Sequence, residues 1–362
     1  MRVCMAAGGT GGHIYPAMAL AKEICKDPDS EVLFVGTTTR MEAKILPEAG
    51  YPYLGIEVTG VANQSLLGKI APLFQILKAK NVVRKKLKEF KPDIVVGFGN
   101  YISVPVILAA KELGIPTMLH EQNSIAGKAN LLLGKIADKI VISHEDSAKD
   151  FPAEKTVLLG NPRASEAAEI KADPSALTKL GLDPAKKTVL IVMGSLGSES
   201  VNETMKEVLK RLAGREYQIV FAAGREGFEE YVKDLETGEN ERVLPFVDQL
   251  ALMRVSEMIV SRAGATSTAE IATMGIPAIL VPSPYVPNNH QHFNALSMVH
   301  AGCAVELEEK DLTAEKLVSM LDEYMNDPEK LAKMRENAKG IGFPDASKNM
   351  KKLMAEMIRV KK

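Results

Sequence analysis

The feature that most constrains the fold is a rhythm of short apolar runs, rich in valine and isoleucine, that alternate with helical patterns. Continuous apolar strands, each followed by a helix, are typical of parallel sheets covered on both faces. The rhythm occurs twice, and each half opens on a strand and a glycine-rich turn. We therefore predict an α/β protein with two doubly wound, Rossmann-like domains. The expected strands are 2–5, 31–35, 93–98, 117–120, 139–142 and 156–159, then 188–193, 217–222, 242–246, 258–261, 278–281 and 304–306.

Length and charge limit the possibilities further. A chain of 362 residues is long enough for two domains with separate cores. The strand pattern gives way to polar sequence near Gly160-Asn161-Pro162, so we expect domains over 1–160 and 161–341 and a final helix over 342–362. The formal net charge of −1 provides no basic field that would collect nucleic acid. The sequence shows neither a signal peptide nor an apolar run of the roughly 18 residues that span a bilayer, so we expect a cytoplasmic protein.

The first glycine turn is the strongest candidate for a binding site. Doubly wound sheets bind ligands beyond the carboxyl ends of their strands. Gly8-Gly9-Thr10-Gly11-Gly12-His13 follows the first strand and precedes a helix. Glycines there let backbone N–H groups approach an anion at the N-terminus of the helix, where the dipole adds attraction. The turn has neither the P-loop lysine nor the spacing of a dinucleotide fingerprint. A strand–helix turn without a ligand is the alternative.

Two further polar features lie in the first half. His13 ends the glycine turn. The unperturbed pKa of a histidine, about 6.5, suits a general base at neutral pH. A role in capping the helix or in orienting other groups is the alternative. His120-Glu121-Gln122-Asn123 follows a strand, and Asn130 comes in the next helix. Four hydrogen-bonding side chains in succession would destabilise the fold if they were buried without partners. Either a polar ligand or a network within the loop satisfies them.

The second half repeats the arrangement. Gly194-Ser195-Leu196-Gly197-Ser198 follows one strand, and Ala265-Thr266-Ser267-Thr268-Ala269-Glu270 joins another strand to a helix. Small hydroxyl residues at a helix start favour an anion. The carboxylate of Glu270 can accept hydrogen bonds from the two hydroxyls of a ribose. The alternative is that Glu270 is an ordinary glutamate on the helix surface.

A metal site is not expected. Asp27-Pro28-Asp29 has the form of a metal-binding carboxylate pair, but it precedes a strand and is therefore interpreted as a turn. No other carboxylate cluster is apparent in the sequence, so we expect a mechanism without a metal or a cofactor.

An apolar stripe with basic flanks lies between Gln64 and Pro92. It suits the surface of an anionic membrane, and a core-facing helix with a solvated basic side is the alternative. The membrane is favoured because only Glu89 offsets the basic run. The apolar members are Leu66, Leu67, Ile70, Leu73, Phe74 and Leu77, and the basic ones are Lys69, Lys78, Lys80, Arg84, Lys85, Lys86 and Lys88.

At these residues the chain resembles the bacterial peptidoglycan N-acetylglucosaminyltransferases (MurG family), and the resemblance covers nearly the whole chain. Five motifs occur in the order of the family. They are the glycine turn through His13, the His120–Asn123 tetrad, Asn161-Pro162-Arg163, the 265–270 segment, and His290-Gln291 near Asn294-Ala295.

The resemblance implies the GT-B fold, with two Rossmann-like domains facing across a cleft. By this resemblance, domain 1–160 binds the acceptor and associates with the membrane, and domain 161–341 binds the UDP-sugar. The final helix, 342–362, crosses back to the first domain. The implied reaction is inverting transfer of N-acetylglucosamine from UDP-N-acetylglucosamine to the C4 hydroxyl of undecaprenyl-diphosphate-muramoylpentapeptide, at the cytoplasmic face of the membrane. A single displacement of this kind needs a base for the hydroxyl proton, and His13 is our candidate for it. The implied substrate contacts are Thr10, Gly11, Gly12, Asn123, Arg163, Ser195, Val247, Ala265, Thr266, Ser267, Thr268, Ala269, Glu270 and Gln291.

Four alternatives stay open at this point. One of them is a non-catalytic, membrane-docked sensor, which leaves the polar residues of both domains unexplained. Within the same fold, the chain is either another lipid-linked glycosyltransferase or a UDP-N-acetylglucosamine 2-epimerase, and an epimerase would consume the donor without an acceptor. A nucleotide-binding dehydrogenase is the alternative from another class, and the missing dinucleotide fingerprint argues against it.

Overall fold

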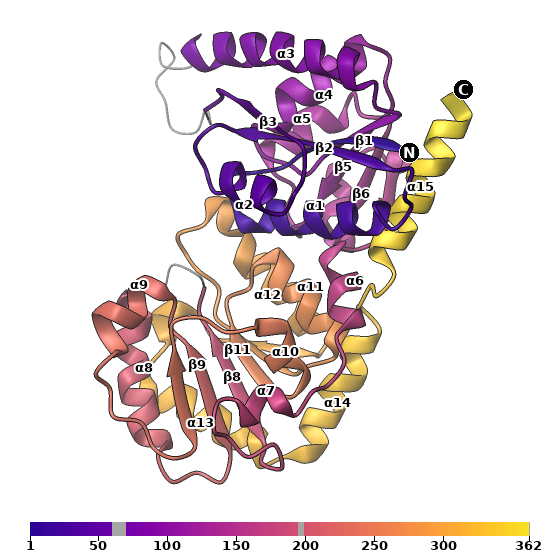
Figure 1. Ribbon diagram of the computed structural model, residues 1–362. Helices are drawn as coiled ribbons and strands as arrows, with labels where there is room; N and C mark the ends of the chain where they lie inside the picture. Colours follow the sequence, from indigo (N-terminus) through magenta and orange to yellow (C-terminus); the bar gives the residue numbers. More distant parts are fainter. Residues whose placement is uncertain (60–69, 195–198, 362) are drawn as a thin grey trace. The chain divides into compact units, whose positions relative to one another are not determined.

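The computed structural model describes residues 1–59, 70–194 and 199–361 (Figure 1). It divides into two compact units. Unit 1 is Met1–Ser165 with Asp345–Lys362, and unit 2 is Glu166–Pro344. Each unit holds one parallel sheet with helices packed on both of its faces. The predicted α/β class with two Rossmann-like domains is therefore confirmed.

Unit 1 is built on seven parallel strands in the order β3-β2-β1-β4-β5-β6-β7. The central strand β1 aligns Val3 with Val32 of β2 and with Ile94 of β4. The first glycine turn therefore leaves the middle of the sheet at its carboxyl edge. The strands are β1 Arg2–Ala6, β2 Glu31–Thr37, β3 Tyr53–Ile56, β4 Ile94–Gly97, β5 Thr117–Glu121, β6 Lys139–Ile142 and β7 Thr156–Leu158.

Helices cover the two faces of this sheet because alternate strand residues point to opposite sides. Cys4 and Ala6 pack with α3, α4 and α5, whereas Val3 and Met5 pack with α1 and α15. Helix α2 contacts β2 and β3. The helices are α1 Gly11–Ile24, α2 Glu42–Glu48, α3 Ile70–Phe90, α4 Ser103–Glu112, α5 Lys128–Gly134, α6 Arg163–Glu169, whose first residues belong to unit 1, and α15 Ala346–Lys361.

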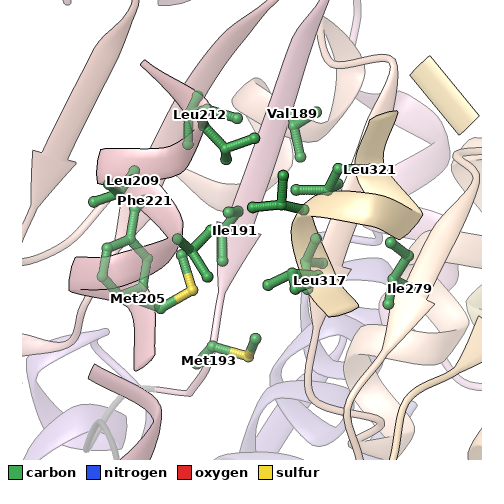
Figure 2. Packing of buried hydrophobic residues seen from close by; sticks show 14 of the residues in the cluster. Val189, Ile191, Met193, Met205, Leu209, Leu212, Phe221, Ile279, Leu317 and Leu321 are labelled. Carbon is green, nitrogen blue, oxygen red and sulfur yellow. The ribbon is translucent and has the colours of Figure 1, made fainter. Parts of the chain in front are cut away.

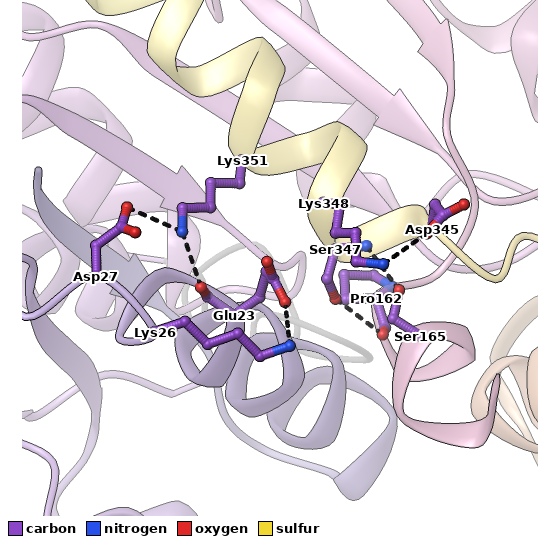
Figure 3. Close-up of polar contacts among 9 residues, drawn as sticks. All are labelled: Glu23, Lys26, Asp27, Pro162, Ser165, Asp345, Ser347, Lys348 and Lys351. Atoms are coloured by element: carbon purple, nitrogen blue, oxygen red, sulfur yellow. Dashed lines mark hydrogen bonds and ion pairs between the residues drawn. The ribbon is translucent and has the colours of Figure 1, made fainter. Parts of the chain in front are cut away.

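Polar contacts fix α15 to unit 1 (Figure 3). Lys351 Nζ donates to the carbonyl oxygen of Glu23 near the end of α1 at 3.1 Å, and it lies 2.9 Å from the carboxylate of Asp27. A cation at that position also suits the helix dipole. The Ser347 amide donates to Ser165 Oγ, and the Ser347 hydroxyl donates to the Pro162 carbonyl, each at 3.0 Å. Residues 27–29 form a turn before β2, as predicted.

Unit 2 has six parallel strands in the order β10-β9-β8-β11-β12-β13. Its strands are β8 Thr188–Val192, β9 Gln218–Ala222, β10 Glu241–Leu244, β11 Met258–Ser261, β12 Ala278–Leu280 and β13 Ala304–Glu306. Its helices are α7 Ser175–Thr178, α8 Glu199–Leu212, α9 Arg225–Gly227, α10 Gln249–Arg254, α11 Ala265–Met274, α12 His290–His300, α13 Ala314–Met325 and α14 Pro328–Lys339.

The core of unit 2 shows the same alternation. Val189 and Ile191 of β8 pack against α8 and α13, and Figure 2 shows Met205, Leu209 and Leu317 around them. The intervening residue of β8 packs on the opposite side, with α10, α11 and α12. Both faces of the central strands β8, β9 and β11 are thus buried, which explains their continuous apolar runs in the sequence.

The predicted strands all occur, with ends that differ by no more than two residues. The prediction missed β3, which is short, lies at the edge of the sheet and contains Gly55. Its residues are mostly half-buried, so it lacks a continuous apolar run. Unit 1 extends to Ser165 instead of ending at residue 160, and Arg163 therefore lies in unit 1.

Candidate active site

The first glycine turn ends at the start of α1. Thr10 is the N-cap residue with an extended backbone (φ −145°, ψ 159°), and α1 begins at Gly11. Gly9 has a φ of +82°, which favours glycine because a side chain would be strained there. The amides of Gly11 and Gly12 belong to the first turn of the helix, whose N–H groups have no acceptor within the helix. The turn therefore offers N–H donors and a positive dipole end to an anion.

His13 is oriented by the same turn. Its Nδ1 lies 3.0 Å from Thr10 Oγ1. In the tautomer with the proton on Nδ1, the imidazole donates to the threonine hydroxyl and keeps Nε2 as its basic nitrogen. A Cβ atom on Gly99, after β4, would lie 3.3 Å from His13 Cδ2 and 3.4 Å from Asn130 Nδ2. Glycine at this position thus lets both side chains approach the end of β4.

The His120–Asn123 tetrad is largely a network within unit 1. Glu121 accepts hydrogen bonds from the amides of Asn123 and Gly127 at 3.1 and 2.9 Å, and from Asn130 Nδ2 at 2.9 Å. Gln122 Nε2 donates to the carbonyl of Phe98 at 2.9 Å. Three tetrad residues are buried, and Asn123 is half-buried. The loop network considered from the sequence is thus present, and it places Asn123 at the carboxyl edge of the sheet.

His120 is a buried neutral histidine next to the glycine turn. Its Nε2 lies 3.1 Å from the Gly160 carbonyl oxygen. Burial lowers the pKa of His120 to about 4, against the opposing effect of the bond to Gly160, and charge on His13 lowers this pKa further. At neutral pH, His120 therefore adds no positive charge beside His13.

Arg163 lies at the start of α6. Its amide donates to Asn161 Oδ1 at 3.0 Å, so the buried Asn161 side chain caps this helix. The Arg163 guanidinium carbon lies 5.8 Å from the centre of the Tyr15 ring on α1. This contact keeps the guanidinium close to the helix that carries the glycine turn.

The predicted 265–270 segment of unit 2 forms the start of α11, directly beyond β11. Gly264 is the N-cap, with an extended backbone. The Thr268 hydroxyl bonds within the helix, to the carbonyls of Gly264 and Ala265 at 3.2 Å each. Thr266 Oγ1 is buried, and no described residue bonds to it. The segment thus presents first-turn amides, including those of Ala265 and Thr266, while Ser267 and Ala269 are half-buried.

Glu270 is not a surface glutamate. Its side chain is only 3% exposed, and Gln249 Nε2 donates to its Oε2 at 3.1 Å. The side chain of Val247 is buried in the core, so only its main chain is available to a ligand. Beside it, Phe246 is 71% exposed. Sequence reasoning missed Phe246 and Gln249, because a single aromatic and a single amide after a strand give no distinctive pattern.

Gln291 lies at the first turn of α12. Its Oε1 accepts from the Ser283 amide, which follows β12, at 2.9 Å. Nearby, Asn294 Nδ2 donates to the Ala263 carbonyl at 3.1 Å and holds the turn before α11. The segments after β10, β11 and β12 therefore meet at the carboxyl edge of the sheet of unit 2. The predicted contact Ser195 lies outside the described residues.

Helix α3 differs from the sequence interpretation in its charges. Leu66, Leu67 and Lys69 lie outside the described residues. The basic run is offset by more than Glu89, because Glu57 pairs with Lys78 and Glu112 pairs with both Lys80 and Arg84. Phe74 and Leu77 are nevertheless 68% and 44% exposed. Within the described part of the chain, we find no helix long and apolar enough to cross a bilayer and no cluster of three or more metal-ligating side chains.

Comparison with known proteins identifies the family. The sequence profile of the glycosyltransferase family 28 N-terminal domain matches residues 3–142, and that of the C-terminal domain matches residues 188–350. The crystal structure of MurG from Acinetobacter baumannii superposes with a TM-score of 0.79 at 31% identity, covering 98% of this chain and 99% of that one. The chain belongs to glycosyltransferase family 28 and, within it, to the MurG family.

Curated members of the MurG family match over their full length. A protein from Pediococcus pentosaceus is 44% identical, covering 97% of this chain and 98% of its own. One from Bacillus subtilis is 39% identical, covering 99% of each. Both are named UDP-N-acetylglucosamine–N-acetylmuramyl-(pentapeptide) pyrophosphoryl-undecaprenol N-acetylglucosamine transferase. The family resemblance and the GT-B fold inferred from the motifs are confirmed.

The fold is also shared with more distant enzymes. The UDP-N-acetylglucosamine 2-epimerase from Neisseria meningitidis has a TM-score of 0.68 at 18% identity, covering 98% of this chain and all of that one. At this identity, the likeness concerns the fold alone.

Proposed function

We propose that this chain transfers N-acetylglucosamine from UDP-N-acetylglucosamine to the C4 hydroxyl of undecaprenyl-diphosphate-linked N-acetylmuramoylpentapeptide, with inversion at the anomeric carbon. The observation that carries the proposal is the 44% identity, over 97% of the chain, to a transferase named for this donor and this acceptor. The anion-binding geometry of the helix starts in both units supports it, since both substrates carry a diphosphate.

In this proposal, the chemistry at the acceptor belongs to unit 1. Nε2 of His13 takes the proton of the C4 hydroxyl, with Nδ1 held by Thr10. The hydroxyl oxygen bonds to the anomeric carbon while the bond from that carbon to UDP breaks, and UDP leaves with the electron pair. A single displacement of this kind inverts the configuration. Because His120 is neutral at neutral pH, it places no second positive charge beside the base.

Unit 2 holds the nucleotide in this proposal. The first-turn amides of α11 face the diphosphate, the buried carboxylate of Glu270 accepts from the ribose hydroxyls, and the main chain of Val247 meets the uracil. Gln291 is the proposed contact of unit 2 with the sugar, and Asn123 and the glycine-turn residues Thr10 to Gly12 are the proposed substrate contacts of unit 1. Arg163 and the helix dipoles neutralise the departing diphosphate without a metal. Chelation with EDTA is therefore expected to leave the transfer rate unchanged.

Membrane association is the second part of the proposal. Phe74 and Leu77 expose apolar surface at the start of α3. The ion pairs between described residues that involve this helix use Lys78, Lys80, Arg84 and Lys86, and do not involve Lys85 or Lys88. Exposed apolar side chains with nearby lysines favour an anionic leaflet. We place the protein peripherally, at the cytoplasmic face, where its lipid-linked acceptor is presented.

The test is incubation of the protein with labelled UDP-N-acetylglucosamine and the lipid-linked muramoyl acceptor, followed by extraction of the lipid. The proposal expects label in the lipid fraction only when the acceptor is present. A parallel reaction without the acceptor checks the epimerase alternative. Conversion of the donor to UDP-N-acetylmannosamine in that reaction would replace the proposed transfer by epimerisation.

A further inference from the structure

A buried carboxylate lies directly beneath the first glycine turn. Glu42 begins α2 and is 0% exposed. Its Oε2 accepts from the Gly9 amide at 3.0 Å. Its Oε1 accepts from the amide and the hydroxyl of Thr37 at 3.0 and 2.7 Å. One side chain thus ties the turn after β1 to the end of the neighbouring strand β2.

A glycine in the turn after β1 and another on β2 make room for this carboxylate. A Cβ atom on Gly8 would clash with Glu42 Oε1, and one on Gly36 would lie 2.7 Å from Glu42 Cγ. Real Cβ atoms do not approach other atoms so closely, and a buried carboxylate with several bonds has little freedom to move away. Gly8 is therefore required by Glu42, independently of any ligand on the other side of the turn.

The carboxylate is ionised without a neighbouring cation. Burial raises the pKa of Glu42, but the hydrogen bonds from Thr37 and Gly9 outweigh that effect and leave the pKa below its ordinary value. Among the residues that the structure describes, no lysine, arginine or histidine contributes to the charge balance of this carboxylate. Backbone and hydroxyl donors alone hold the negative charge, so loss of one donor leaves a poorly solvated charge.

We propose that Glu42 is a positioning residue for the transfer reaction, holding the glycine turn in the conformation that aims His13 and the helix-start amides. This inference rests on the proposed function. By accepting from Gly9, Glu42 withdraws that amide from any ligand and fixes the backbone one residue before the N-cap Thr10. Thr10 in turn orients the imidazole of His13. The amides of Gly11 and Gly12 then remain as the donors that bind the anion.

The test compares Glu42→Gln with a matched control, Glu241→Gln. Glutamine has the shape of glutamate, but one of its two terminal groups is an NH₂ group, which cannot accept a hydrogen bond. The variant therefore loses either the bond from the Gly9 amide or the bonds from Thr37. Glu241 is also a buried glutamate, and its Oε2 accepts from a glycine amide, that of Gly238, at 3.1 Å. It lies at the amino end of β10 in unit 2, the edge opposite the site.

Two readouts are collected for each variant. The kinetics give kcat and KM for transfer, and hydrogen–deuterium exchange mass spectrometry follows peptides that span residues 6–16. We expect Glu42→Gln to lower kcat at least about tenfold and to speed exchange in the turn, as for a lost hydrogen bond to a charged group. We expect Glu241→Gln to keep kcat within about twofold, with unchanged exchange in the turn, even where it loses as much thermal stability.

Equal kinetics in the two variants, or unchanged exchange in the turn of Glu42→Gln, would overturn the inference. If Glu42→Gln fails to fold, Thr37→Val removes the hydroxyl that donates to Glu42 and accepts from the Arg40 amide, and it keeps the Thr37 amide donor. Faster exchange in the turn is again expected, with unchanged exchange as the refuting result. If the unmodified protein transfers no sugar, the proposed function fails. The exchange comparison alone then decides whether Glu42 holds the turn.

Discussion

The buried imidazole of His120 makes the stability of unit 1 depend on pH in a calculable way. Its pKa is about 4 in the folded protein, against about 6.5 in an unfolded chain. Because the folded pKa is the lower one, the unfolded chain takes up the proton first as the pH falls. The stabilisation is therefore complete above pH 6.5 and is lost progressively towards pH 4. The difference of about 2.5 between the two pKa values corresponds to about 3 kcal/mol.

The assay is urea unfolding of wild type and His120→Gln at pH 7 and pH 5. Glutamine retains an N–H donor for the Gly160 carbonyl but does not titrate. Between the two pH values, the wild type is expected to lose about 2 kcal/mol more unfolding free energy than the variant. His300→Gln, which changes an exposed histidine on α12, serves as the control and is expected to follow the wild type. Parallel pH dependence of wild type and His120→Gln would refute the argument.

Three further predictions concern the proposed reaction. His13→Ala is expected to lower kcat about 10²-fold or more with UDP affinity near that of the wild type, and a loss below about threefold would remove His13 as the base. Glu270→Ala is expected to raise KM for the donor at nearly constant kcat, whereas an unchanged KM would exclude the ribose contact. Phe74→Glu is expected to weaken sedimentation with anionic vesicles, whereas Val360→Glu, at another exposed apolar residue, is not. Equal effects of these two glutamates would refute the membrane proposal.

The sequence predicts the sheets well because both faces of nearly every strand are buried. Burial on both faces gives continuous apolar runs such as 94–97 and 258–261, which need no knowledge of tertiary contacts. β3 is the strand that the prediction missed: it has four residues and includes Gly55, whereas the other half-buried edge strands, β7, β10 and β13, were predicted. The glycine turns are also recognisable, because several glycines in succession between a strand and a helix indicate a tight backbone that side chains would obstruct.

The supporting residues of the site are not predictable from local patterns. Glu42 lies 33 residues from Gly9 along the chain, and only the pairing of β1 with β2 brings it under the turn. The same applies to Glu57 and Glu112, which offset charges on α3 from other elements. Local patterns reveal which residues are buried or flexible, whereas these contacts depend on how distant elements pack. The burial of Glu270 likewise depends on its neighbour Gln249 on α10.

The most direct test of the central claim is the stoichiometry of the reaction. UDP release and sugar incorporation into the muramoyl lipid are measured in the same reaction, with and without the acceptor and after EDTA treatment. We expect one UDP released for each sugar incorporated, a product with inverted anomeric configuration, and no UDP release without the acceptor. UDP release that does not depend on the acceptor, or a product of retained configuration, would contradict the central claim.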